Sequence, residues 1–179
     1  MRIIAGSLGG RTFDAPRGHR THPMGDKIRG ALFNILGDIT GLTVLDAFAG
    51  SGALSFEAIS RGAASALAID VDKEAHQTIQ ANIAALELDA QVIVMRKNVA
   101  GWSRNNKDKK FDIVLADPPY DDIRPQLLQS LIVQVVPDGI FVLSWPGSEP
   151  VRDFPGVSVL TSKSYGDAQL VFYRKQSVV

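Results

Sequence analysis

The feature of this sequence that most constrains its fold is a glycine-containing loop at residues 47–52. The loop joins a strand-like apolar run at 43–48 to a helix-like run at 53–61. From Gly41 onward, short runs rich in β-forming residues alternate with runs of helical periodicity. This alternation predicts an α/β fold, in which helices cover both faces of a mainly parallel sheet.

The remaining elements follow from the same reading of periodicity and turn residues. Strands are expected at 43–48, 66–71, 91–95, 111–116 and 139–145, and helices at 53–61, 73–86 and 124–135. Two more strand-like runs, 157–161 and 169–174, share a short link, which favours an antiparallel hairpin at the sheet edge. Before the loop we expect short strands at 2–5 and 11–13 and a helix at 26–36. The polar stretch 96–110 predicts an exposed loop.

Length and composition limit the possible chemistry. A chain of 179 residues can bury one core, and it contains no cysteine. That absence excludes disulfides, thiolate zinc sites and a cysteine nucleophile that could attack a ring carbon. The three histidines lack ligand spacing, so no metal site is expected. With no membrane-length apolar run and no signal peptide, a cytoplasmic monomer is the default expectation.

The loop favours a particular ligand. A dinucleotide fingerprint would place a third glycine at position 55, where Ser55 stands. The carboxylate of Asp46 would repel a pyrophosphate but suits an ammonium group, as S-adenosylmethionine carries. Asp70 follows Gly50 by 20 residues, at the end of the second strand, where an acidic side chain binds ribose hydroxyls; Asp72 is the competitor. The predicted cofactor-binding residues are Asp46, Phe48, Ala49, Gly50, Ser51, Gly52, Asp70, Val71, Asn98 and Val99.

One of these residues keeps two interpretations. Asn98 follows the third strand at the same edge, where it could reach an adenine amino group. A turn asparagine without a ligand is equally consistent with that position.

The segment Asp117-Pro118-Pro119-Tyr120 follows the expected strand 111–116 and suggests the reaction. An exocyclic amino nitrogen on a base is a poor nucleophile until acceptors on its N–H groups favour a tetrahedral geometry. Asp117 and the carbonyl of Pro118 can supply two acceptors, and Pro119 stiffens the turn. Tyr120 offers a face on which the base can stack. We therefore expect these four residues to be catalytic.

Charge is distributed unevenly along the chain, although the formal net charge is zero. Residues 1–30 contain six basic and two acidic residues, a balance of +4, and the remainder carries −4. Such asymmetry is typical of a basic face that meets nucleic acid, and a solvated terminus would produce it as well.

Taken together, the motifs at 46–54, 57–58, 60–63 and 117–120 resemble the bacterial 16S ribosomal RNA guanine-N2 methyltransferases, a family named for guanine 966. The likeness includes 2–6, 10–11, 26–29, 32–34 and 165–167, and so spans nearly the whole chain. It implies a seven-stranded Rossmann-like class I methyltransferase domain at 41–179. It also implies an N-terminal extension at 1–40 that helps to hold RNA of the small ribosomal subunit.

From this extension and the C-terminal hairpin we predict the RNA-binding residues Arg2, Arg11, Arg20, His22, Lys27, Arg29 and Tyr165. The chain departs from the family at His22-Pro23-Met24, where Arg-Pro-Thr is common, and at Gly30, where glutamate is frequent. Both departures lie in the RNA-facing segment.

Three other functions compete with this interpretation. A DNA adenine-N6 or cytosine-N4 methyltransferase would use the same acceptors, but the chain has no room for a separate DNA-recognition domain. Ser55 and Asp46 argue against a nicotinamide-dependent oxidoreductase. A non-catalytic RNA-binding protein would not need the ligand loop.

Overall fold

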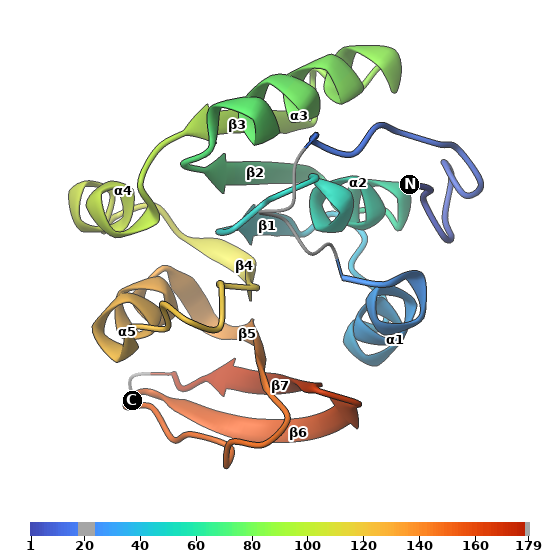
Figure 1. Cartoon of the computed structure of the whole chain (residues 1–179). Coiled ribbons are helices and arrows are strands. Elements are labelled where there is room, and N and C mark those ends of the chain that lie inside the picture. Colours follow the sequence, from blue (N-terminus) through green and yellow to red (C-terminus); the bar gives the residue numbers. More distant parts are fainter. Residues whose placement is uncertain (18–23, 178–179) are drawn as a thin grey trace.

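The strands form one seven-stranded sheet in the order β3-β2-β1-β4-β5-β7-β6 in a computed structural model that describes residues 1–17 and 24–177 (Figure 1). The first five strands of this order are parallel, β7 is antiparallel to β5, and β6 is antiparallel to β7. The α/β architecture and the C-terminal hairpin are confirmed. In chain order the elements are α1 (Asp26–Leu36), β1 (Thr43–Asp46), α2 (Ala53–Ser60), β2 (Ser65–Asp70), α3 (Lys73–Ala85), β3 (Val92–Arg96), α4 (Val99–Asn105), β4 (Phe111–Ala116), α5 (Pro125–Val133), β5 (Val135–Pro146), β6 (Val157–Tyr165) and β7 (Ala168–Lys175).

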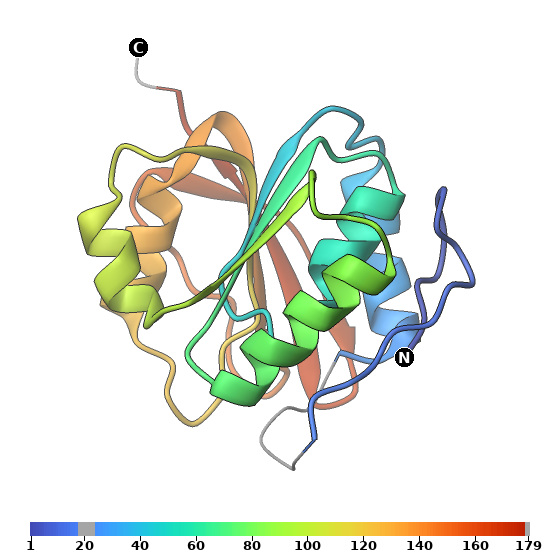
Figure 2. The same cartoon turned by 90° about the horizontal axis from the view of Figure 1, so that it is seen from above.

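The side chains of alternate strand residues pack into two separate hydrophobic cores, because successive side chains of a strand point to opposite faces of the sheet. On β1, Val44 packs into the core under α1, α2 and α3, and Leu45 packs into the core under α4 and α5. Figure 2 shows these two helical layers on opposite sides of the sheet. Apolar burial on both faces explains why the parallel strands read as nearly continuous apolar runs.

The chain crosses from one helical layer to the other between β3 and β4, which places β4 beside β1. Asp46 at the end of β1 pairs with Leu115 of β4. In open α/β sheets this reversal of strand order opens a ligand-binding crevice at the carboxyl ends of the strands. The predicted cofactor and catalytic segments both follow strand ends at this edge.

The N-terminal part shares its core with the rest of the chain. Ile3, Phe13, Leu32 and Phe33 are buried in the same cluster as residues of the sheet. Phe13 meets Phe56 of α2 edge to face, with ring centroids 5.1 Å apart. The strands expected at 2–5 and 11–13 reduce to a single antiparallel bridge between Arg2 and Thr12.

Two expectations were wrong. The stretch 96–110 contains helix α4, in which Asn98 caps the first turn and Trp102 is buried. Strand β5 begins at Val135, where we expected helix, because Phe111 of β4 donates a backbone hydrogen bond to the carbonyl of Gln134. The interruption that hid this start is an irregularity at Asp138, whose φ of 62° is left-handed. No helix in the described residues is long and apolar enough to cross a membrane.

Candidate functional site

The loop between β1 and α2 has the conformation that its glycines permit. Gly50 and Gly52 have φ values of 53° and 78°, in the left-handed region. A Cβ on Gly52 would lie 2.9 Å from the ring of Phe56 and 3.1 Å from Ile79. Only glycine therefore fits there, and the backbone turns directly into the first turn of α2. Gly50 and Gly52 donate their own N–H groups to Asp70 and to the carbonyl of Ala49, so the donors that a ligand could use are those of the first turn of α2.

Asp46 is the buried carboxylate at the base of this loop. It is 1% exposed and accepts a hydrogen bond from the hydroxyl of Ser55 at 2.8 Å. Burial raises the pKa of Asp46 to about 7, and the nearby charges of Asp117 and Asp70 act in the same direction. A carboxyl group that is costly to ionise in isolation favours a cationic ligand beside it. This property fits the ammonium group that the sequence predicted for this position.

Asp70 ties the end of β2 to the loop. Its carboxylate accepts the N–H of Gly50 at 2.8 Å and the N–H of Asp72 at 2.9 Å. Each carboxylate oxygen retains a second lone pair for a ligand hydroxyl. Asp72 instead caps α3 by accepting the N–H of Ala75 at 2.9 Å. Asp70 contacts the glycine loop and therefore stays the predicted ribose ligand. The adjacent Val71 is 62% exposed.

Of the remaining predicted cofactor residues, one is exposed and the rest are buried or partly buried. Asn98 is exposed, and its side-chain oxygen accepts the N–H of Gly101 at 3.1 Å as the cap of α4. Its amide nitrogen is the part of the side chain that a base could use. Val99 packs in the core, which leaves only its backbone to face a ligand. Ala49 and Ser51 are buried and Phe48 is partly buried, so they support the loop.

The Asp-Pro-Pro-Tyr segment leaves β4 at the same edge. Tyr120 is 41% exposed, and its hydroxyl lies 2.9 Å from the hydroxyl of Ser144 on β5. Burial raises the pKa of Asp117, and the nearby hydroxyl of Ser144 opposes part of that shift. The buried hydroxyl of Ser144 therefore lies close to Asp117 and contacts Tyr120 directly.

The sequence analysis did not identify Ser144 as a site residue, although its position in an apolar run could have indicated it. It is the polar residue in the apolar run 140–145 and is only 4% exposed. A buried hydroxyl at the carboxyl end of a strand needs a hydrogen-bond partner, and the partner here is Tyr120, a predicted catalytic residue. Because β1 pairs with β4, this edge also brings the buried carboxylate of Asp46 close to Asp117.

The predicted RNA-binding residues differ in exposure and in the contacts that they make. Arg2 is exposed and pairs with Asp26 at 3.0 Å, and Lys27 is exposed on α1. Arg11 donates to the carbonyls of Ala85 and Leu86 at the end of α3. Tyr165, at the end of β6, packs partly against the core. Arg20 and His22 lie outside the described residues.

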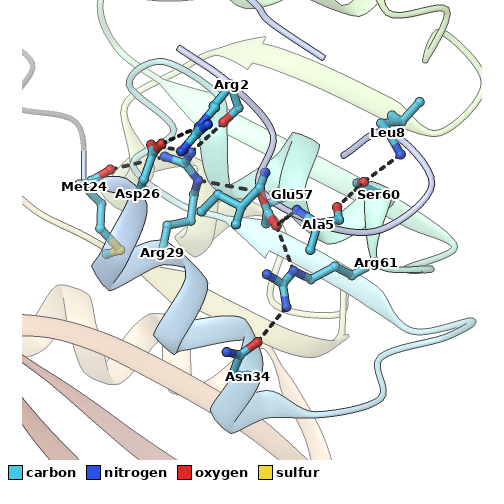
Figure 3. A network of polar contacts seen from close by, with 11 residues as sticks. Arg2, Ala5, Leu8, Met24, Asp26, Arg29, Asn34, Glu57, Ser60 and Arg61 are labelled. Carbon is cyan, nitrogen blue, oxygen red and sulfur yellow. Dashed lines mark hydrogen bonds and ion pairs between the residues drawn. The ribbon is translucent and has the colours of Figure 1, made fainter. Parts of the chain in front are cut away.

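Arg29 corrects the predicted set, because it is 0% exposed. Its guanidinium donates to the carbonyls of Met24 and Arg2 and to the carboxylate of Asp26 (Figure 3). The sequence analysis predicted Arg29 as an RNA-binding residue, a role that requires an accessible guanidinium. The chain that folds back over α1 covers it instead, so Arg29 cannot contact RNA in this conformation.

An open cleft of about 860 Å³ extends from the site edge between residues 14–17 and the start of α3. Acidic and basic side chains alternate on its walls, which are formed by Asp14, Ala15, Arg17, Asp72, Lys73, Glu74, Gln77, Thr78 and Ala81. Among residues 1–17 and 24–177, no cluster of histidine and carboxylate side chains is arranged to hold a metal ion.

The sequence of this chain is similar to the sequences of known proteins. The sequence matches the family described as "Conserved hypothetical protein 95" over residues 1–174. It is 33% identical to "Putative rRNA methyltransferase YlbH" of Bacillus subtilis (strain 168), over 98% of this chain and 100% of that protein. It is 37% identical to "Ribosomal RNA small subunit methyltransferase D" of Escherichia coli (strain K12), over 67% of this chain and 60% of that protein.

A solved structure extends the likeness to the whole fold. The structure titled "Putative methyltransferase yhhF from Escherichia coli" superimposes with a TM-score of 0.85 at 30% identity. The superposition covers 98% of each chain, including the N-terminal segment and the C-terminal hairpin.

Proposed function

This chain belongs to the family described as conserved hypothetical protein 95, and from that premise we propose that it methylates an exocyclic amino group in ribosomal RNA. The finer assignment is N2-methylation of a guanine in the 16S RNA of the small subunit, with S-adenosylmethionine as donor. The names of the relatives support RNA of the small subunit as substrate. The observation that carries the chemistry is the Asp117–Ser144–Tyr120 arrangement beside the Asp46 loop.

The residues at the strand ends fit the cofactor part by part. Asp46 would face the ammonium group, the first turn of α2 the carboxylate, and Asp70 the ribose hydroxyls. The exposed side chain of Val71 offers an apolar surface to the adenine. When bound, S-adenosylmethionine supplies an electrophilic methyl group on its sulfonium.

The Asp-Pro-Pro-Tyr segment prepares the nucleophile. The carboxylate of Asp117 and the carbonyl of Pro118 accept hydrogen bonds from the two amino N–H groups, which draws electron density onto the nitrogen. As the new C–N bond forms, the bond between the methyl carbon and sulfur would break and release the donor as a neutral thioether. The nitrogen would then pass one proton to Asp117. The raised pKa of Asp117 makes it a stronger proton acceptor than an ordinary aspartate. Tyr120, held by Ser144, presents its ring to the base.

The test is a single-turnover methylation assay on small-subunit RNA, with mass spectrometry to identify the modified base. We expect methylguanosine, and we expect Asp117→Ala to lower the rate by roughly 10²- to 10⁴-fold with little change in cofactor affinity. Tyr120→Phe should be mild and Tyr120→Ala severe, because stacking needs the ring. A methyl group on ring carbon or ribose, or a fully active Asp117→Ala protein, contradicts the proposal.

A further inference from the structure

Glu57 of α2 lies in the interior and binds the beginning of the chain (Figure 3). Its two carboxylate oxygens accept the backbone N–H groups of Ile4, at 2.8 Å, and of Ala5, at 3.1 Å. Arg61 donates its Nε to the same carboxylate at 2.8 Å, and the Nε of Arg29 lies 3.7 Å from it. Glu57 and Arg29 are both 0% exposed. One buried carboxylate thus joins α1, α2 and the N-terminal segment.

The charges in this network are costly to bury. The Nε of Arg29 has no hydrogen-bond partner in the described residues, so the guanidinium relies on Glu57 and Asp26 for charge compensation. Apolar side chains of similar volume often hold two helices together equally well, without the desolvation of ions. Packing alone therefore does not account for a buried carboxylate at this position, and its specific partners indicate what it does.

Besides the two arginines, those partners are backbone N–H groups of the segment 1–17, which we call the N-terminal arm. Because Glu57 binds N–H groups, it fixes the arm without occupying the arm's side chains. Ser60 extends the attachment by accepting the N–H of Leu8 at 2.9 Å and donating to the carbonyl of Ala5. At Gly6 the arm lies so close to α2 that a Cβ would overlap the carbonyl oxygen of Ser60.

The far end of the arm is attached to α3. Asn82 exchanges two hydrogen bonds with the backbone of Asp14, at 3.0 and 2.8 Å. Beyond this point, residues 14–17 form one wall of the cleft that begins at Asp72. The position of that wall therefore depends on how the arm lies across α2 and α3.

Helix α2 connects this attachment to the reaction site. Its first turn leaves the glycine loop, and Ser55 in the same helix donates to Asp46. Glu57 lies two residues further along. A rigid, fully buried helix thus fixes the arm relative to the cofactor loop.

We propose that Glu57 is a positioning residue for substrate: it holds the N-terminal arm so that the arm and the cleft wall present RNA in register with Asp117. This inference rests on the proposed function for the identity of the substrate. It makes Glu57 act through the arm, with no contact to the cofactor or to the reacting atoms.

The experiment compares Glu57→Gln with the wild-type protein. Glutamine keeps the shape but turns an NH₂ group toward donors that need an acceptor. We expect the KM for small-subunit RNA to rise about 10-fold or more, the effect of leaving a buried donor unpaired, while kcat and S-adenosylmethionine affinity change less than about 3-fold. Hydrogen exchange should show loss of protection at the Ile4 and Ala5 amides. Asp122→Asn, which removes the carboxylate of an exposed ion pair with Arg124, is the matched control.

Ser60→Ala provides a second, milder variant in case Glu57→Gln does not fold. It removes the acceptor for Leu8 and should raise the KM for RNA by a smaller factor. An unchanged KM in a variant whose arm amides have lost protection overturns the inference. A rise in KM that is accompanied by equally large decreases in kcat and in cofactor affinity overturns it as well. If the wild-type protein binds the RNA but transfers no methyl group, the proposed function fails. In that case the RNA affinities of the same variants test the role of Glu57. A wild-type protein that binds no RNA overturns both the proposed function and the role of Glu57.

Discussion

At the scale of single residues, the site depends on which polar groups are buried and what they bind. Ser144 positions Tyr120 by a hydrogen bond between the two hydroxyl groups, and it lowers the pKa of Asp117 against the rise that burial causes. The Tyr120 ring is thereby held by a bond at its hydroxyl end while the residue remains 41% exposed. The sequence identified Asp117 and Tyr120 and missed Ser144, since serine in a strand has no distinctive spacing.

Asp46 carries a prediction about pH. Its folded-state pKa of about 7 lies above the ordinary aspartate value of 3.8, so between these two pH values the folded protein holds a proton that the unfolded chain releases. This carboxyl group therefore contributes stability at low pH that is lost as the pH rises toward and through 7. Asp46→Asn should lose less thermal stability than wild type between about pH 5 and 8, as measured by unfolding at each pH. Parallel pH profiles for the two proteins would contradict this assignment.

The same carboxyl group should couple cofactor binding to proton release. If the ammonium of S-adenosylmethionine binds ionised Asp46, wild-type affinity should rise by up to about tenfold per pH unit below pH 7 and then level off. Asp46→Asn should bind more weakly and lack this rise. Calorimetry in two buffers of different ionisation enthalpy measures the released proton directly.

At the scale of elements, the sequence predicted most strands and helices because the parallel sheet imposes long apolar runs and regular alternation. It failed where tertiary contacts override local pattern. Helix α4 has few apolar residues, and the burial of Val99 and Trp102 and the capping by Asn98 stabilise it within a polar stretch. The start of β5 was hidden by the Pro137-Asp138-Gly139 interruption, which the pairing with β4 bridges.

Asn98 provides a test at this scale, because it belongs both to α4 and to the predicted cofactor site. Asn98→Asp keeps the cap but loses the amide donor, whereas Asn98→Ala loses both. If the side chain only caps α4, alanine should cost about 1 kcal/mol of unfolding free energy and aspartate should restore wild-type behaviour in full. If the amide also binds adenine, aspartate should restore stability but leave cofactor affinity reduced. Chemical denaturation and calorimetry on the same samples separate the two roles.

At the scale of the whole molecule, the N-terminal arm is part of the fold rather than an appendage. Its apolar residues share the core with the sheet, and its backbone is fixed on α2 and α3. The local sequence could not reveal this, because Arg29 and Glu57 meet only after α1 and α2 have packed. The basic character of residues 1–30 is consequently weaker at the surface than the sequence suggested, since Arg29 is internal.

The remaining surface charges lead to a prediction about salt. Arg2, Arg11 and Lys27 are exposed, and if each contacts a phosphate, binding of RNA releases counterions in proportion to those contacts. Replacing all three by alanine should weaken RNA affinity and reduce the slope of log affinity against log salt by roughly 2, at about 0.7 to 0.9 for each contact.

The matched control removes three exposed charges, Arg104, Lys107 and Lys109, around the end of α4 that leads into the amino end of β4, away from the site edge. Arg2→Ala and Arg11→Ala also remove contacts to Asp26 and to the end of α3, so each variant needs a thermal unfolding curve beside its titration. An equal change of slope in the control would mean that RNA responds to total charge. An unchanged slope in the N-terminal variant would place the RNA contacts elsewhere on the molecule.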